Sequence, residues 1–248
     1  MRPLQMLCTV LAALGAVACD GSSSAPPAPS PAPRQATSAT PVLDSYRAVW
    51  TQIDRDKLAL SLYFYPGRAT IQIDASAPPN VRQDLIAFLA SIQPQLKRVI
   101  ELSAQPPEPF PPQPSENQVR TRDAHMDHPL AWMQNFARLL NADAMRCWES
   151  GDAAAAAARV IASIRLGEAM QSQTSEQVRT TGVGIMGQGL RLALALIEAG
   201  LASKLSPPAL AELRAAANGF TIRQPYESSS LSAMANEQLQ KLRQKLAN

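Results

Sequence analysis

Apolar residues recur every three or four positions along most of the chain after residue 41, which is the period of an amphipathic α-helix. In the N-terminal part this pattern predicts helices over about 42–53 and 81–99, with Asn80 as the N-cap of the second helix. Pro94 lies inside the second pattern and should kink or split that helix. In the C-terminal part the pattern predicts helices over about 129–149, 153–173, 175–199, 207–218 and 229–246.

Turn and cap signals separate the C-terminal helices. The dipeptide His128-Pro129 predicts the start of the first one, because proline suits the first helical position. Gly151-Asp152 then predicts a left-handed helix end followed by an aspartate N-cap. Thr174 with Gln177 predicts a capping box for the third helix, and Ser206 caps the fourth. We therefore expect the helices on either side of Gly151-Asp152 to fold back on each other as an antiparallel pair.

The apolar pattern of residues 58–73 is compatible with more than one kind of secondary structure. Leu58, Leu60, Leu62 and Phe64 alternate with other residues, and a turn signal and a second alternating run follow. This predicts a small β-hairpin, although the first run fits a helix equally well. The fold class is accordingly all-α, a stack of antiparallel helical hairpins packed as in tetratricopeptide proteins but without their consensus, with one small β-hairpin near 58–73 as an option.

The segment 182–189 contains the string G-x-G-x-x-G. A dinucleotide-binding loop with this string follows a strand and opens a helix, whereas here the preceding residues already have a helical pattern. The alternative is that small residues let this helix approach the alanine-rich helix before it, which contains six consecutive alanines. We expect close helix packing rather than a phosphate site.

The first 41 residues indicate where the protein is found. Residues 1–18 have the pattern of a secretory signal peptide, with an apolar run that ends in an Ala-x-Ala cleavage site. Cys19 follows directly, and residues 19–41 form a spacer rich in Ser, Pro and Ala. The segment resembles a bacterial lipoprotein signal, which implies lipidation of Cys19 and a membrane anchor. A secreted protein without lipid and an uncleaved N-terminal anchor are the alternatives.

The remaining chain divides at a second proline-rich stretch. Residues 42–104 form an N-terminal helical part, 105–127 a proline-rich loop, and 128–248 a C-terminal helical part, with 42–248 as one domain. Six prolines between Pro106 and Pro114 exclude a regular helix there and favour an extended connection. A docking motif for an aromatic groove on another protein is the competing interpretation.

Composition narrows the class of partner. The net charge is +3, and no block of basic residues is interleaved with aromatic ones, so the sequence gives no case for nucleic-acid binding. With 46% hydrophobic but only 5% aromatic residues, we expect a core of aliphatic side chains, with polar residues such as Gln171 on the surface. No segment after the signal looks apolar enough to span a membrane. Cys147 is the lone thiol outside the first 19 residues, and we expect it to be buried.

One stretch of the C-terminal part resembles a known group of proteins. Its quoted elements are Ala137-Arg138-Leu139-Leu140 with Asp143-Ala144, then Gly151-Asp152 with Ala155-Ala156, then Arg165-Leu166-Gly167-Glu168-Ala169. This pattern, over about 129–218, is similar to exported helical-hairpin proteins of planctomycete-type bacteria. The resemblance implies antiparallel helix pairs joined by Gly-Asp turns, and it implies no activity.

The strongest candidate for chemistry is a short run of ligand-type side chains, Asp123, His125, Asp127 and His128. Histidine and aspartate at these spacings are able to ligate Zn²⁺ or another divalent ion. The competing interpretation, which we favour, is a polar loop that leads into the Pro129 helix, with Asp127 near the helix N-terminus. We predict no metal site, no catalytic residue and no cofactor, since no hydrolase or metalloprotease motif occurs.

These observations favour a non-catalytic protein-binding or scaffold module at the cell envelope. The expected partners are a membrane, through the N-terminal lipid, and another protein. An enzyme, or a carrier of a small molecule or metal, with its site assembled between helices, is the alternative.

Overall fold

The computed structural model describes residues 41–63, 78–111, 126–223 and 229–247, and the regular secondary structure within these ranges is entirely helical. The all-α prediction is therefore confirmed for this part of the chain. In chain order the elements are α1 Val42–Trp50, the 3-10 helix η1 Asp56–Tyr63, α2 Val81–Ser91, α3 Gln93–Ser103, α5 Pro129–Glu149, α6 Ala153–Gln171, α7 Glu176–Glu198, α8 Leu201–Lys204, α9 Pro207–Gly219 and α10 Ser229–Ala247. All of them belong to one compact unit, residues 39–248.

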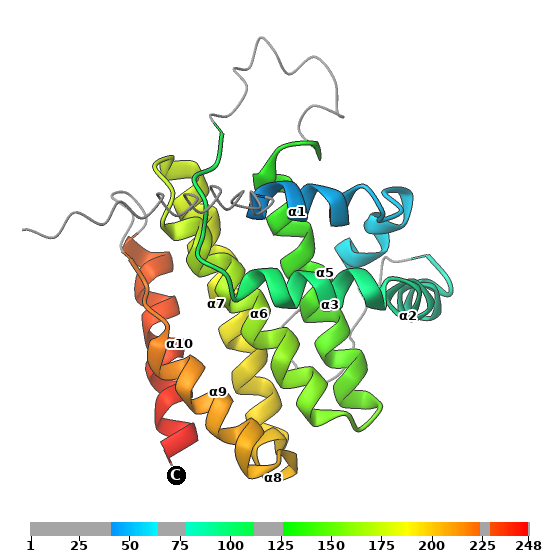
Figure 1. The fold of residues 1–248 in the computed structure, drawn as a ribbon. Helices are drawn as coiled ribbons and strands as arrows, with labels where there is room; N and C mark the ends of the chain where they lie inside the picture. The colour runs from blue at the N-terminus through cyan, green and yellow to red at the C-terminus, as the bar shows by residue number, and fades with distance from the viewer. Residues whose placement is uncertain (1–40, 64–77, 112–125, 224–228, 248) are drawn as a thin grey trace, which may run out of the picture. The chain divides into compact units, whose positions relative to one another are not determined.

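The long helices α5, α6 and α7 run side by side in alternating directions (Figure 1). The first reversal has the predicted form, because Gly151 has a φ of +87° and the Asp152 carboxylate accepts the Ala155 N–H at 2.9 Å. Glycine adopts this left-handed conformation without the Cβ strain that other residues incur. The antiparallel pair predicted on either side of Gly151-Asp152 is thus confirmed.

Glycines bring α6 and α7 into backbone contact. A Cβ on Gly182 would lie 2.6 Å from the Gly167 carbonyl oxygen, and one on Gly189 would lie 2.7 Å from Ile164. The predicted close packing is confirmed at these two positions. It does not extend to Gly184, where a Cβ would meet nothing within 4 Å. The whole glycine string lies inside α7, so it does not form a loop that opens a helix.

Helix α10 packs against both α7 and α9. Lys245 of α10 pairs with Glu198 of α7 at 3.4 Å, so the C-terminal ends of these two helices lie together and the helices run parallel. Arg214 of α9 donates to the Leu246 carbonyl at 2.6 Å, and Arg243 of α10 donates to the Ala217 carbonyl at 3.0 Å. Each arginine thereby satisfies carbonyls that the end of the other helix leaves without a partner.

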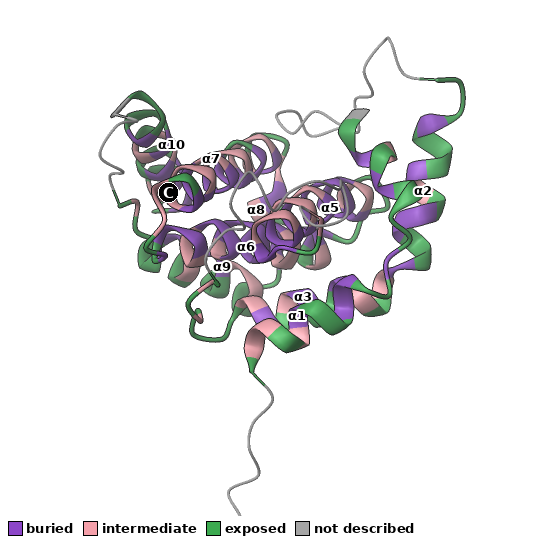
Figure 2. Ribbon diagram, turned by 90° about the horizontal axis from the view of Figure 1, so that it is seen from above, coloured by how far each residue is buried: buried purple, intermediate pink, exposed green. Residues whose placement is uncertain are grey.

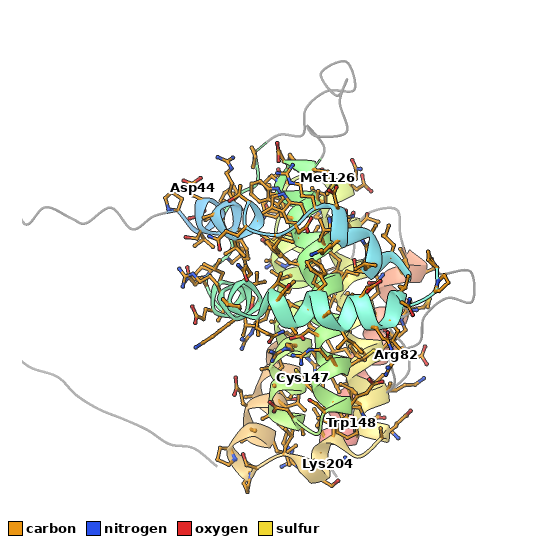
Figure 3. All side chains as sticks on the ribbon, turned by 90° about the vertical axis from the view of Figure 1, so that its right-hand side faces the viewer. Asp44, Arg82, Met126, Cys147, Trp148 and Lys204 are labelled. Carbon is orange, nitrogen blue, oxygen red and sulfur yellow. The ribbon has the colours of Figure 1, made fainter. Side chains whose placement is uncertain are left out.

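The short helix α8 lies against the end of α5. The ammonium of Lys204 stands 4.3 Å from the centroid of the Trp148 ring, which is a cation–π contact between these elements (Figure 3).

The N-terminal helices pack on α5 through aromatic side chains. The rings of Tyr46 and Trp50 lie 5.9 Å and 5.7 Å from the Phe136 ring, centroid to centroid. Figure 2 shows that α1, α2 and α3 carry exposed residues on one side and buried residues on the other. The break predicted at Pro94 is confirmed, because α2 ends at Ser91 and α3 begins at Gln93 with the proline in its first turn.

Two local predictions in the N-terminal part are confirmed only in part. Of the two alternatives for the run that begins at Leu58, the structure has the helix: residues 58–62 form part of η1, with Leu58 and Ser61 buried at the three-residue spacing of a 3-10 helix. Residues 64–73 of the possible hairpin lie outside the described ranges. Asn80 is the N-cap residue of α2, as predicted, but it has a φ of +69° and its side chain makes no cap bond.

Two predictions at the ends of α6 and α7 are wrong. The N-cap of α7 is Ser175, one residue beyond the expected Thr174, and its side chain makes no cap bond. Gln171 is 2% exposed, because its amide oxygen accepts the Arg223 N–H at 2.8 Å and its nitrogen donates to the sulfur of Met186. The segment that follows α9 therefore covers Gln171, because the Arg223 N–H needs an acceptor and Gln171 provides it.

The proline-rich segment 105–111, here called the strap, has no regular secondary structure, as predicted. Gln173 fastens it to the end of α6: the Gln173 oxygen accepts the Phe110 N–H at 2.7 Å, and its nitrogen donates to the Glu108 carbonyl at 3.0 Å. The Glu108 carboxylate in turn accepts the N–H groups of Val42 and Leu43, both at 2.9 Å. A strap side chain thus caps the N-terminus of α1.

Helix α7 is long and apolar enough to cross a bilayer, contrary to the expectation that no segment after the signal is. More than half of its apolar stretch, 56%, is buried inside the domain. A core helix packed between α6 and α10 has the same composition.

Candidate functional site

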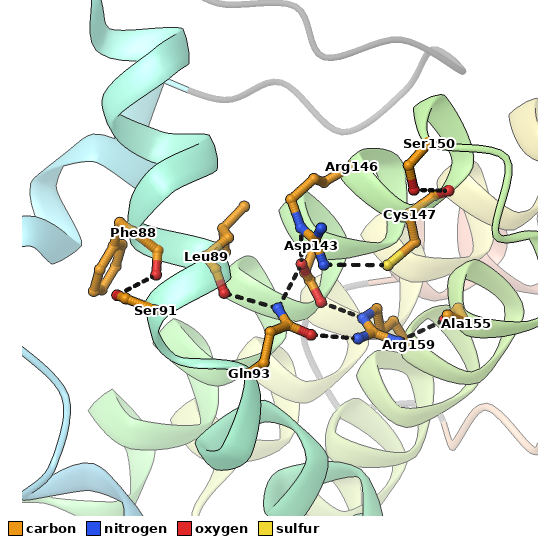
Figure 4. A network of polar contacts seen from close by, with 10 residues as sticks. All are labelled: Phe88, Leu89, Ser91, Gln93, Asp143, Arg146, Cys147, Ser150, Ala155 and Arg159. Atoms are coloured by element: carbon orange, nitrogen blue, oxygen red, sulfur yellow. Dashed lines mark hydrogen bonds and ion pairs between the residues drawn. The ribbon is translucent and has the colours of Figure 1, made fainter.

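The most elaborate polar cluster of the described residues surrounds Asp143, whose side chain is fully buried on α5 (Figure 4). One carboxylate oxygen accepts from Arg146 Nε at 2.6 Å and from Gln93 Nε2 at 3.0 Å. The other accepts from Nε of Arg159 on α6. Arg159 also donates to Gln93 Oε1 at 2.7 Å. The cluster therefore joins the start of α3 to both α5 and α6.

This cluster is suited to structure rather than to catalysis. Two guanidinium groups and one amide donate to the Asp143 oxygens, and the side chain is fully buried, so it presents no accessible surface to a substrate. Cys147 lies beside it at 3% exposure, and burial raises the pKa of its thiol, with the nearby Asp143 charge acting in the same direction. A protonated buried thiol is a poor nucleophile. Cys147 is thus the buried thiol that the sequence predicts.

The sequence pattern alone does not predict a polar cluster at Asp143. The available signal was a carboxylate within a run of apolar positions on α5, between Leu140, Ala144 and Cys147. An acidic side chain in such a place is rarely buried without a cation. That signal does not identify Arg159, sixteen residues away, as the partner.

The predicted site residues fall into two groups. Cys19, Asp123 and His125 lie outside the described residues. Asp127 pairs with Arg55 at 2.7 Å, while His128 Nδ1 accepts the Leu130 N–H at 3.1 Å and its Nε2 lies 3.3 Å from the Pro111 carbonyl oxygen. His128 is therefore the N-cap of α5, and the cap role is carried by His128 rather than by Asp127.

A cleft between η1 and α2 is a candidate binding site. Its volume is about 460 Å³. One wall comes from η1, where Lys57 and Leu60 follow the three-residue period. The other wall is one face of α2, with positions spaced by three and four residues. The α2 residues that line it are Asp84, Ala87, Phe88 and Ser91.

The floor of this cleft is apolar and its rim is acidic. Phe88, which is 3% exposed, and the half-buried Leu60 form the floor, and Ala87 is an exposed apolar residue beside them. Three aspartates stand around it, namely Asp54, Asp56 and Asp84. In the part of the chain that the structure describes, no three His, Cys, Asp or Glu side chains lie close enough together to hold a metal ion. The cleft aspartates therefore form a charged rim and no metal cage.

Nearby basic side chains leave much of this charge unbalanced. Lys57 pairs with Asp54 at 3.4 Å. Arg55 is directed to Asp127 and to the Trp50 ring, whose centroid is 5.8 Å away. Arg82 pairs with Glu149 at 2.8 Å. Asp56 and Asp84 make no ion pair with any described residue, so the rim carries a net charge of −2.

Comparisons with protein-family models, curated proteins and solved structures find no match to this chain.

Proposed function

We propose that this chain is exported to the bacterial cell envelope, is anchored to the cell membrane or the outer membrane by a lipid on Cys19, and acts there as a non-catalytic module that binds another protein. The anchor is supported by the order of signal, Ala-x-Ala site, cysteine and spacer in residues 1–41. The binding activity is supported by the cleft between η1 and α2.

The cleft suits a protein better than a small molecule. Apart from Phe88 and the half-buried Leu60, every residue that lines it is exposed. A ligand in it would keep much of its surface in water, whereas small-molecule sites bury about 70–90% of their ligand. A protein partner gains additional contact area on the surface around such a cleft.

A photo-crosslinking residue at Ala87 tests the binding site in the native bacterium. Ala87 is exposed and lines the cleft, and the matched control is Ala215, an exposed alanine on α9. We expect an adduct of one discrete mass from Ala87 and none from Ala215, with the partner identified by mass spectrometry. The same adducts from both positions, or no adduct from Ala87, would contradict the proposal.

The anchor has a separate test. Cys19→Ser should move the protein from the membrane fraction to the soluble fraction or block its processing. Mass spectrometry of the wild-type protein should show an acylated Cys19 at the new N-terminus. An unmodified Cys19 in a soluble product would contradict the lipid anchor and leave the binding site untouched.

A further inference from the structure

The cleft between η1 and α2 has two properties that together specify its occupant. The floor, formed by Leu60 and Phe88, offers apolar contact. The two aspartates without an ion pair among the described residues stand on different walls, Asp56 on η1 and Asp84 on α2. The apolar strip is therefore flanked by negative charge on both sides.

We infer that the cleft binds a segment of another protein that carries a large apolar side chain with lysine or arginine residues on either side of it. This inference rests on the proposed protein-binding function and adds the chemistry of the partner. The apolar side chain covers the Phe88 floor, and one flanking cation meets each of Asp56 and Asp84. An acidic segment would instead add like charge to a rim that is already negative.

Within the described residues, the two arginines next to these positions are engaged elsewhere. Arg55 and Arg82 are the nearest arginines in sequence to the two walls, and each is held in an ion pair of 2.7–2.8 Å with an acid outside the cleft. The Asp54 side chain is also engaged, because it accepts the Asp56 N–H at 3.1 Å and pairs with Lys57. The charge available to a partner is therefore that of Asp56 and Asp84.

A large apolar side chain is exposed on η1, the helix that forms one wall of the cleft, although it does not line the cleft itself. Leu62, near the end of η1, is 64% exposed, which is the largest exposed fraction of any large hydrophobic side chain among the described residues. Exposed apolar surface rimmed by charge is typical of protein-binding sites. Affinity should come mainly from the apolar contact, and the aspartates should select the sign of charge and accelerate association at low salt.

The test uses the full-length chain in neutral detergent and three labelled peptides of about twelve residues, long enough to include the i to i+7 anchors of a helical recognition segment. The first has a leucine core flanked by lysines, the second has glutamate in place of lysine, and the third keeps the lysines with serine in place of leucine. Fluorescence anisotropy gives each Kd. We expect the first peptide to bind at least about tenfold more tightly than either of the others, as two exposed ion pairs or one apolar anchor would provide.

A variant that lacks both aspartate charges tests whether the charge preference of the peptides arises at the cleft. Asp56→Asn with Asp84→Asn should weaken binding of the lysine–leucine peptide about tenfold and flatten its salt dependence. The matched control is Asp44→Asn, an exposed aspartate on α1 outside the cleft, which should change the Kd less than about twofold.

The outcomes separate the two proposals. Failure of the lysine–leucine peptide to bind, or equal binding of the lysine and glutamate peptides, would overturn the inferred partner chemistry. If Ala87 still gave its discrete crosslink in that case, the protein-binding site would stand with a partner of different chemistry. If the Ala87 crosslink were also absent, both proposals would fail.

Discussion

Gly167 on α6 and Gly182 on α7 face each other so closely that a Cβ built on either one would lie 2.6–2.7 Å from the carbonyl oxygen of the other. Real Cβ atoms do not approach an oxygen to that distance, so two helix backbones meet here without side chains between them. The pair fixes how deeply α7 packs into α6.

Substitution of these glycines should therefore separate packing from helix propensity. Gly182→Ala should lower the free energy of unfolding by about 1–3 kcal/mol, because the backbones must move apart. Gly184→Ala, two residues away in the same helix and with open space at its Cβ, should raise it by up to about 1 kcal/mol. Chemical denaturation of both variants measures the difference. Stabilisation by Gly182→Ala would contradict the close contact.

Removal of the Asp143 carboxylate should lower the free energy of unfolding substantially. Asp143→Ala would leave the Arg159 guanidinium, which is 12% exposed, without its carboxylate. Removal of one partner from a buried pair typically costs about 3–5 kcal/mol. The control is Glu101→Gln, which breaks an ion pair with Arg98 in which both side chains are 49% exposed, and it should cost less than about 1 kcal/mol. Similar midpoints for the two variants in urea unfolding would show that the cluster does not stabilise the fold.

The turn between α5 and α6 allows backbone strain and capping to be measured separately. Gly151→Val should cost about 1–2 kcal/mol from the left-handed backbone alone, since no atom lies within 4 Å of the new Cβ. Asp152→Ala should cost about 1 kcal/mol because the bond from the Ala155 N–H is lost. Gln177→Ala, at an exposed position in the first turn of α7, serves as the near-neutral reference in thermal unfolding. A Gly151→Val variant as stable as this reference would argue against the turn.

Alkaline pH should destabilise the domain through Cys147. Burial raises the pKa of the thiol above its ordinary value of 9.0, so the unfolded chain loses this proton at a pH where the folded chain keeps it. The unfolded state then binds fewer protons, and the stability, fully present below pH 9, falls as the pH rises, by at most about 1.4 kcal/mol per pH unit for one group.

Unfolding in urea at about pH 8 and about pH 10 measures this slope. Cys147→Ala should start from a lower stability but show a shallower decline. Burial also raises the pKa of Tyr46 well above its ordinary value of 10.0, so part of the decline should remain in the variant. Equal slopes for the two proteins would mean that Cys147 titrates in the folded state as it does in the unfolded chain.

Much of the helical order was predictable because it depends on neighbouring residues. The periods of apolar positions located five of the six described C-terminal helices, all but the four-residue α8, and Gly151-Asp152 identified the reversal. Predictions failed where a distant backbone decided the outcome. Gln171 is polar and lies at a helix end, and only the chain at Arg223 explains its burial.

The candidate cleft was not predictable in the same way. Asp56 on η1 and Asp84 on α2 are far apart in sequence, and the alternation of Leu58, Leu60 and Leu62 fits a strand and a helix equally well. The sequence directed attention to Asp127 and His128, which the fold uses for an ion pair and a helix cap. Composition did identify ligand-type residues, but it contained no information on which helix faces would lie opposite each other.

The hydrogen bonds from α1 to the Glu108 carboxylate also affect how the domain would resist a force applied at its N-terminus. Any tension applied to the chain ahead of Val42 enters the domain at the two N–H groups that the Glu108 carboxylate holds. From there it passes along the strap to the side chain of Gln173 and so into the end of α6, the helix that contacts both α5 and α7. A force on the N-terminal side of α1 would therefore act on the strap and on α6 as well as on α1. Separation of α1 from the domain would require these hydrogen bonds to break together with the packing of α1.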